Sequence, residues 1–312
     1  MELKLFLVFF CCYIFPCHSQ EVAEQASTTN MEDLRAQVNR NGATMVNIAS
    51  IPDFVFENPD LGLLSITESY QLEVLPQKIE SLKKLQLLYL GGLGITTLPD
   101  AVWNLDQINN LYLSNLYLTE IPAGIGELTN LKKLSLSVMD IDKLPSSIGN
   151  LKGLTDLELR NFTGRYKLGD RVIVLEGIDQ LPEEISQLTE LNKVQMYSVG
   201  LKRLPKEIGN WNKVRFLNLS GNQLESLPES MGDMGLLDYL NLTGNRINSL
   251  PSSIIRLSNL KTLKLKYNNL ATINVDLSLM TGLTYLDLEG NPITAKQVEV
   301  LRAKMPNCKI KY

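Results

Sequence analysis

The chain has 312 residues with a formal net charge of −4, and 21% of its residues are charged. This near-neutral balance removes the usual electrostatic reason to expect a nucleic acid or an anionic membrane as partner. There are one histidine and four cysteines, which disfavours most metal and nucleophile chemistries. Leucine is abundant instead, with 57 residues, and this excess indicates an internal repeat.

Residues 1–19 have the pattern of a secretory signal peptide. Lys4 provides a positive charge, and residues 5–15 form an uncharged apolar run. Small residues, Cys17 and Ser19, then occupy the two positions that a signal peptidase reads, so we expect cleavage after Ser19. Eleven apolar residues are too few to cross a bilayer core, which needs about 20. We therefore expect export and no membrane insertion after cleavage.

Cleavage would change the chemistry available to the mature chain. The only histidine, His18, and three cysteines, Cys11, Cys12 and Cys17, would leave with the signal peptide. The remaining Cys308 cannot form an internal disulfide, so the mature protein must be stabilised by its core. We interpret Cys308 as a small buried apolar residue rather than a reactive thiol.

Residues 20–60 are expected to cap the N-terminal end of the fold. Residues 31–40 are largely polar, with Leu34 and Val38 four residues apart, which predicts a short helix with one apolar face. Residues 46–55 then form half of a repeat. Both elements would cover leucines that the first complete repeat leaves exposed.

Residues 61–293 contain ten repeats with a period of 23 residues, apart from a first spacing of 24 and one later spacing of 37. Each repeat approximates L-x-x-L-x-L-x-x-N-x-L-x-x-L-P-x-x-I-x-x-L. The first apolar residue of the L-x-L pair is Leu64, Leu88, Leu111, Leu134, Leu157, Val194, Leu217, Leu240, Leu263 or Leu286. The proline is present as Pro76, Pro99, Pro122, Pro145, Pro182, Pro205, Pro228 and Pro251.

The physical chemistry of one repeat predicts its local structure. The L-x-L alternation predicts a short strand with one buried face. Proline lacks an N–H donor and ends the extended segment, and the following I-x-x-L spacing favours a single helical turn. One repeat cannot enclose its own leucines, so successive repeats are expected to stack into a solenoid with a continuous core.

The chain resembles leucine-rich repeat proteins of the 23-residue L-P-x-x-I class, such as Ras-suppressor-like and exported bacterial proteins. The resemblance covers residues 43–312. It implies an α/β repeat solenoid, the leucine-rich repeat horseshoe, with a parallel concave β-sheet and short helical or 3-10 turns on the convex side. The chain lacks the cysteine caps common in animal and plant extracellular members, which favours a bacterial exported protein.

In this family an asparagine at the ninth repeat position bonds the backbone of adjacent turns. A ladder of this kind is expected in the last four repeats, from Asn222, Asn245, Asn268 and Asn291. The six earlier repeats instead carry Ser69, Leu93, Leu116, Met139, Phe162 and Val199 at this position. Two interpretations stay open, namely neutral sequence drift and an N-terminal half that is looser or differently curved.

The spacing of 37 places an insertion at about residues 164–177. Gly169-Asp170 between two β-rich segments predicts a small hairpin, which is either a neutral surface feature or part of a binding face. At the other end, residues 294–312 form the C-terminal cap. Thr294 is expected to begin a helix, and residues 308–312 are expected to form a final edge strand.

The variable strand positions between the buried leucines should face the concave side, where a partner would bind. Aromatic residues there supply contact area at low entropic cost, although they can also simply support the sheet. The candidate partner-binding residues are Tyr89, Tyr112, Glu158, Arg160, Tyr197, Phe216, Tyr239, Lys264 and Tyr285. The partner is expected to be a protein, with no nucleic acid and no cofactor.

The residues on this sheet face do not favour catalysis. Asp156 and Glu158 lie two residues apart on one strand, as a glycosidase pair can, but an open sheet does not readily raise a carboxyl pKa. We therefore predict no catalytic, cofactor or metal site. The predicted function is a non-enzymatic protein-interaction module, monomeric and exported to the medium, periplasm or cell surface. The alternative is a structural cell-envelope scaffold or adhesin.

Overall fold

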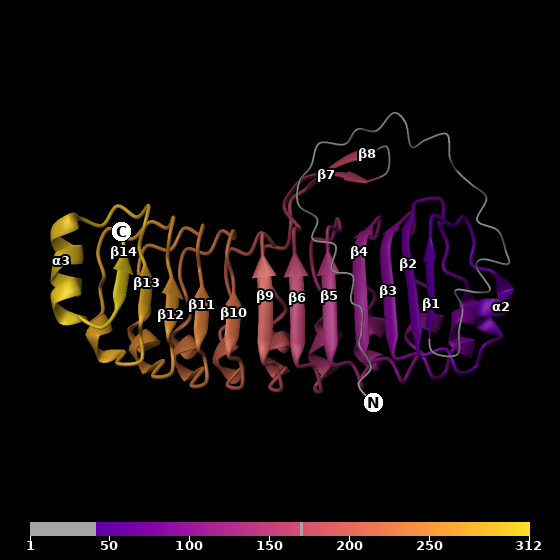
Figure 1. The fold of residues 1–312 in the computed structure, drawn as a ribbon, viewed down its shortest axis with the longest axis horizontal. Helices are drawn as coiled ribbons and strands as arrows, with labels where there is room; N and C mark the ends of the chain where they lie inside the picture. The colour runs from indigo at the N-terminus through magenta and orange to yellow at the C-terminus, as the bar shows by residue number, and fades with distance from the viewer. Residues whose placement is uncertain (1–41, 169–170) are drawn as a thin grey trace.

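The computed structural model describes residues 42–168 and 171–312, which form one elongated solenoid (Figure 1). A single sheet contains twelve strands in the order β1-β2-β3-β4-β5-β6-β9-β10-β11-β12-β13-β14. Every pairing in this sheet is parallel, for example Leu217 with Leu240. The predicted α/β repeat solenoid is therefore confirmed. The expected signal peptide and the helix at residues 31–40 lie outside the described residues.

The strands lie side by side in chain order, and short helical turns follow most of them on the opposite side. The strands are β1 (Gly42–Val46), β2 (Leu63–Ser69), β3 (Leu87–Leu93), β4 (Asn110–Leu116), β5 (Lys133–Ser137), β6 (Asp156–Arg160), β7 (Gly164–Leu168), β8 (Arg171–Leu175), β9 (Lys193–Tyr197), β10 (Phe216–Asn218), β11 (Tyr239–Asn241), β12 (Thr262–Lys264), β13 (Tyr285–Asp287) and β14 (Lys309–Lys311). The 3-10 turns are η1 (Gln77–Ser81), η2 (Asp100–Val102), η3 (Ala123–Glu127), η4 (Ser146–Asn150), η5 (Glu183–Gln187), η6 (Ile208–Asn210), η7 (Glu229–Asp233), η8 (Ser252–Arg256) and η9 (Leu277–Leu279). The α-helices are α2 (Asp53–Phe56) and α3 (Ala295–Lys304).

The core runs the length of the solenoid between the sheet and the 3-10 turns. The repeated leucines of neighbouring strands are in register and fully buried, as Leu134, Leu157 and Val194 illustrate. Burial of such a side chain contributes about 1.5–3 kcal/mol before the loss of chain entropy is counted. The repeat prolines lie directly before most 3-10 turns in extended conformation, so they end one segment and start the next.

Both ends of the sheet are closed by shorter elements. Thr294 begins α3 with a capping box in which its side chain and that of Gln297 bond each other's backbone amides. Val298 and Leu301 of this helix are buried, and β14 extends the sheet beyond β13. Cys308 is buried, and burial raises the pKa of its thiol, as expected for a structural residue. At the N-terminal end the structure adds β1, a strand that the sequence analysis did not predict.

The insertion forms an antiparallel hairpin of β7 and β8, as predicted, with Gly164 opposite Leu175. It leaves the solenoid after β6 and returns before β9 (Figure 1). The sheet is not interrupted, because Leu157 of β6 pairs directly with Val194 of β9 across the 37-residue spacing. The hairpin is therefore an addition to the solenoid and not a replacement for a repeat.

Where the strands end, the backbone N–H and C=O groups obtain hydrogen-bond partners in two different ways. In the C-terminal half the strands have three residues, and the asparagine that follows bonds the neighbouring turns. Asn245 Nδ2 donates to the carbonyls of Leu219 and Leu242, both at 2.9 Å, while its Oδ1 accepts from Leu224 N at 3.0 Å. Asn222, Asn268 and Asn291 make equivalent bonds.

In the N-terminal half the strands themselves extend further. Strands β2, β3 and β4 have seven residues, and Leu93 pairs with Leu116 at the position that asparagine occupies in later repeats. Backbone pairing therefore replaces side-chain bonds, and the apolar residue fills the core. Ser69 retains part of the asparagine role, because its Oγ accepts from Ile48 N at 3.0 Å. The longer strands argue against a looser N-terminal half.

The residue directly before this ninth position has positive φ in all ten repeats. These residues are Glu68, Gly92, Asn115, Val138, Asn161, Ser198, Gly221, Gly244, Tyr267 and Gly290. Glycine and asparagine tolerate this left-handed conformation, whereas a β-branched side chain is strained there. Val138, at φ 52°, is the β-branched residue of this set.

Replacement of this valine should stabilise the protein. We expect Val138→Asn to raise the free energy of unfolding by about 0.5–1 kcal/mol, because the left-handed region costs most residues about 1–2 kcal/mol and asparagine less. Chemical denaturation measures the change. Val138→Thr is the control, since threonine keeps the β-branch and should give no gain; equal midpoints for the two variants would contradict the strain argument.

Loss of a ladder asparagine should be costly. Asn245→Ala removes three buried hydrogen bonds and leaves backbone groups unpaired, so we expect the free energy of unfolding to fall by about 1–3 kcal/mol. The control is Asn248→Ala, at an exposed position in the same repeat, which should change little. An unaltered denaturation midpoint for Asn245→Ala would exclude a stabilising ladder.

Candidate binding surface on the parallel sheet

The exposed face of the sheet carries side chains in three rows that run across the strands. Because the strands are parallel and in register, equivalent residues of successive repeats lie next to one another. All nine candidate residues lie on this face and are half-buried. The structure groups eight of them into three clusters and leaves Tyr285 apart.

The first cluster lies on β3, β4 and β5. The rings of Tyr89 and Tyr112 have centroids 5.8 Å apart at an interplanar angle of 42°. Lys133 Nζ lies 5.2 Å from the centroid of the Tyr112 ring. Gly91 makes this arrangement possible, because a Cβ at that position would lie 2.7 Å from Cε1 of Tyr89.

The second cluster is polar and lies on β5, β6 and β9. Glu158 accepts hydrogen bonds from Ser135 Oγ at 2.8 Å and Gln195 Nε2 at 3.2 Å, and its Oε1 lies 3.7 Å from Arg160 Nε. Arg160 also donates to the Tyr197 hydroxyl at 3.4 Å. Burial alone would lower the pKa of Arg160, but the Tyr197 hydrogen bond and the charge of Glu158 raise it overall. Most polar groups of this cluster are paired with one another, but Arg160 Nε is buried and makes no hydrogen bond.

The third cluster spans β9 to β12 and is a continuous stack. The rings of Phe216 and Tyr239 are parallel, with an interplanar angle of 3° and centroids 4.5 Å apart. Lys193 Nζ lies 5.8 Å from the Phe216 centroid, and Lys264 Nζ lies 5.4 Å from that of Tyr239. An aromatic pair thus lies between two lysines, in the geometry of cation–π interactions.

Tyr285 occupies the same row as Phe216 and Tyr239 but does not join their stack. Thr262 of β12 lies between Tyr239 and Tyr285 in the register. The Tyr285 hydroxyl instead donates to Asp287 Oδ2 at 3.3 Å. Of the nine candidates, Tyr285 is therefore the one that joins none of the three clusters.

A charged triad lies at the C-terminal end of the face. Glu289 Oε2 lies 3.0 Å from Lys266 Nζ and 2.9 Å from Lys311 Nζ. Hydrogen bonds from Lys311 and Lys266 hold the pKa of the Glu289 carboxyl below its usual range, and they raise the pKa of both lysines. All three groups are therefore charged at neutral pH.

Two of the lysines beside the aromatic rings, Lys133 and Lys193, were not among the candidate residues. Lys133 and Lys193 contact rings that lie 21 and 23 residues away in the sequence, so their role depends on the register between strands. The repeat alignment contained the necessary signal, because Lys193 and Phe216 occupy the same repeat position. Lys311 was predicted only as part of the final edge strand at residues 308–312.

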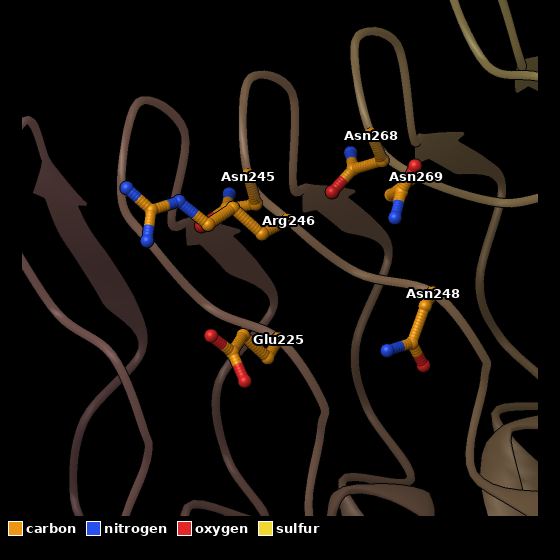
Figure 2. Close-up of a pocket in the computed structure, with 6 residues that line it drawn as sticks. All are labelled: Glu225, Asn245, Arg246, Asn248, Asn268 and Asn269. Atoms are coloured by element: carbon orange, nitrogen blue, oxygen red, sulfur yellow. The ribbon is translucent and has the colours of Figure 1, made fainter.

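A shallow hollow of about 330 Å³ lies elsewhere, on the segments that follow strands β10 to β12. Figure 2 shows its lining residues, Glu225, Asn245, Arg246, Asn248, Asn268 and Asn269. The amide groups of Asn245 and Asn268 already bond the backbone of neighbouring turns. The side chains of Asn245 and Asn268 are therefore already used in hydrogen bonds within the fold. The hollow is a weaker candidate binding site than the sheet face.

Metal-ligand groups and paired carboxylates are two further kinds of site to consider in the described residues. Within residues 42–168 and 171–312, no three His, Cys, Asp or Glu side chains are grouped so that they could hold a metal ion. The carboxylates of Asp156 and Glu158 bond separate neighbours, Thr155 Oγ1 for the former and Ser135 Oγ for the latter. In the same part of the chain, no helix has the length and apolar character needed to cross a bilayer.

The aromatic stack should add modestly to stability. We expect a double-mutant cycle with Phe216→Ala and Tyr239→Ala to give a coupling free energy of about 0.5–1.5 kcal/mol, the range for stacked aromatic pairs. Chemical denaturation of the two single variants and the double variant measures it. A coupling near zero would mean that the rings contact each other without stabilising the sheet.

Comparison with known proteins places these features in a family. The model of the leucine-rich repeat region matches residues 60–161 and 206–303, and no curated protein matches the chain. A Listeria monocytogenes internalin is 19% identical with a TM-score of 0.57, over 92% of this chain and 91% of that one.

Two plant receptor structures share the fold over part of their length. The ectodomain of the Arabidopsis thaliana receptor kinase GASSHO1, solved with CASPARIAN STRIP INTEGRITY FACTOR 2, is 21% identical with a TM-score of 0.62. The plant peptide hormone receptor RGFR1, solved with RGF2, is 21% identical with a TM-score of 0.52. The matches cover 87% and 85% of this chain but only 38% and 48% of the receptor chains. With a family model matched over most of its length, the chain belongs to the leucine-rich repeat family.

Proposed function

We propose that this protein is a non-enzymatic interaction module that binds a protein partner on the concave sheet face. The observation that carries the proposal is the continuity of this face across twelve parallel strands, with two aromatic–lysine clusters on it. Aromatic and basic side chains of this kind are enriched at binding hot spots. The partner-binding residues proposed are Tyr89, Tyr112, Glu158, Arg160, Tyr197, Phe216, Tyr239, Lys264 and Tyr285.

The fold neighbours support a role in protein recognition. Leucine-rich repeat domains are in general interaction modules, and the plant receptors above were solved with the ligands CASPARIAN STRIP INTEGRITY FACTOR 2 and RGF2. We further propose that the chain belongs to the 23-residue L-P-x-x-I class and acts as a monomer. Residues 1–19 would direct export, so that the module works in the medium, the periplasm or on the cell surface.

The test is capture of a partner from an extract of the exported and envelope proteins of the source cells. Wild-type protein should retain a defined partner, and Phe216→Ala/Tyr239→Ala should retain at least tenfold less, because the loss removes both rings of the central stack. Quantitative mass spectrometry of the retained proteins measures the difference.

The control truncates two apolar side chains that lie off the sheet face. Val74→Ala and Leu279→Ala remove exposed apolar side chains outside the strands and should leave capture unchanged. Retention of the same proteins in equal amounts by the wild type and the Phe216→Ala/Tyr239→Ala variant would contradict the proposal. That result would favour the alternative, a structural envelope scaffold or adhesin without a concave ligand.

A further inference from the structure

Charge is distributed unevenly over the sheet face. From β9 to β14 the exposed rows contain five lysines, Lys193, Lys264, Lys266, Lys309 and Lys311. The same rows contain two carboxylates, Asp287 and Glu289. The chain as a whole has a net charge of −4, so this region opposes the charge of the rest of the molecule. A basic patch on an acidic protein favours a partner segment of negative charge.

The charges nearest to the aromatic stack are not neutralised within the described residues. Lys266 and Lys311 share Glu289, whereas Lys193 and Lys264 form no ion pair with a described carboxylate. Their ammonium groups instead lie over the outer faces of Phe216 and Tyr239. Each is therefore available to a carboxylate brought by a partner.

The stack also restricts the kind of group that can bind. The inner ring faces of Phe216 and Tyr239 cover each other, and the outer faces are covered by the two lysines. A nucleobase or a sugar ring could stack on this pair only by displacing one of the two lysines. The ring edges remain, and an aromatic edge carries partial positive charge. The ring edges and the ammonium groups together favour a ligand that has two carboxylates with an apolar side chain between them.

The spacing between Lys193 and Lys264 determines how long a partner segment must be to contact both. Strands β9 and β12 are three strand spacings apart, which is about 14 Å at ~4.8 Å per strand. Thr262 is the β12 residue in the row of Lys193, and Lys264 lies two residues further along the strand, so the Cα atoms of the two lysines are about 16 Å apart. The long lysine side chains lean over the rings between them and shorten this distance. In an extended peptide, side chains on one side recur every ~6.8 Å, so residues four apart are separated by about 14 Å. An acidic residue at each end would reach Lys193 and Lys264, and the residue midway would lie over Phe216 and Tyr239.

We propose that this face binds an extended acidic segment of a protein partner, with acidic residues four apart and an apolar residue midway between them. The segment would run across the strands along the solenoid. This inference rests on the proposed function and names the partner chemistry of the same surface. The closing experiment therefore separates the failure of one from the failure of the other.

The test is selection of random seven-residue displayed peptides on the purified protein. Wild-type protein should enrich Asp or Glu at two positions four apart with an apolar residue midway. The dissociation constant of a selected peptide, measured by fluorescence anisotropy, should rise about tenfold in Lys193→Gln/Lys264→Gln, which removes two ion pairs. Glu289→Gln should tighten binding, because it leaves Lys266 and Lys311 unneutralised.

The control variant Lys143→Gln/Lys206→Gln makes the same change in net charge at exposed positions outside the strands and should bind like the wild type. The inference is overturned if no acidic peptide is enriched, or if the two lysine-pair variants bind equally well. Tighter binding of a labelled single-stranded oligonucleotide or of anionic phosphatidylglycerol vesicles would also overturn it. Neutral peptides that lose binding in Phe216→Ala/Tyr239→Ala would uphold the proposed function and reject only the acidic segment.

Discussion

The burial of each repeat by its neighbours is the constraint on which the rest of the molecule depends. No repeat can enclose its own leucines, so each strand must lie parallel to the next with its apolar positions in register. Once Leu111 is opposite Leu134, the exposed Tyr112 and Ser135 must be neighbours as well. The core therefore fixes which variable side chains meet on the sheet face, although those side chains add little to the core.

The same constraint explains why two backbone arrangements coexist in one solenoid. The chain must turn after every strand, and the turn exposes amide and carbonyl groups that need partners in the interior. Asparagine side chains provide them in the last four repeats, whereas longer strands provide them in the first repeats. Because both solutions keep the left-handed residue before the ninth position, the spacing of the leucines is the same in the two halves.

Much of the fold could be predicted from the sequence, because the repeat, the prolines and the cap residue Thr294 are local signals. Strand β1 was missed because Gly42–Val46 buries Ala43 and Met45 where later repeats use leucine. Asn274 was also missed. It occupies the proline position of its repeat, yet its side chain bonds both the amide and the carbonyl of Leu250, at 3.0 and 2.9 Å. Such contacts join residues of different repeats, so local patterns do not reveal them.

The hairpin shows how a segment can be added to such a fold without disturbing the core. Between β6 and β9 the chain leaves the solenoid to form the hairpin, yet Asp156 still lies opposite Lys193 and Leu157 opposite Val194. An insertion at the end of a strand leaves every apolar contact in place, whereas one within a strand would move leucines to the exposed face. The insertion falls within the Glu158 cluster, and Gln195 of β9 still donates to Glu158 of β6 across it. The core stays uniform along the solenoid, so the repeats differ from one another mainly in the side chains of the exposed rows.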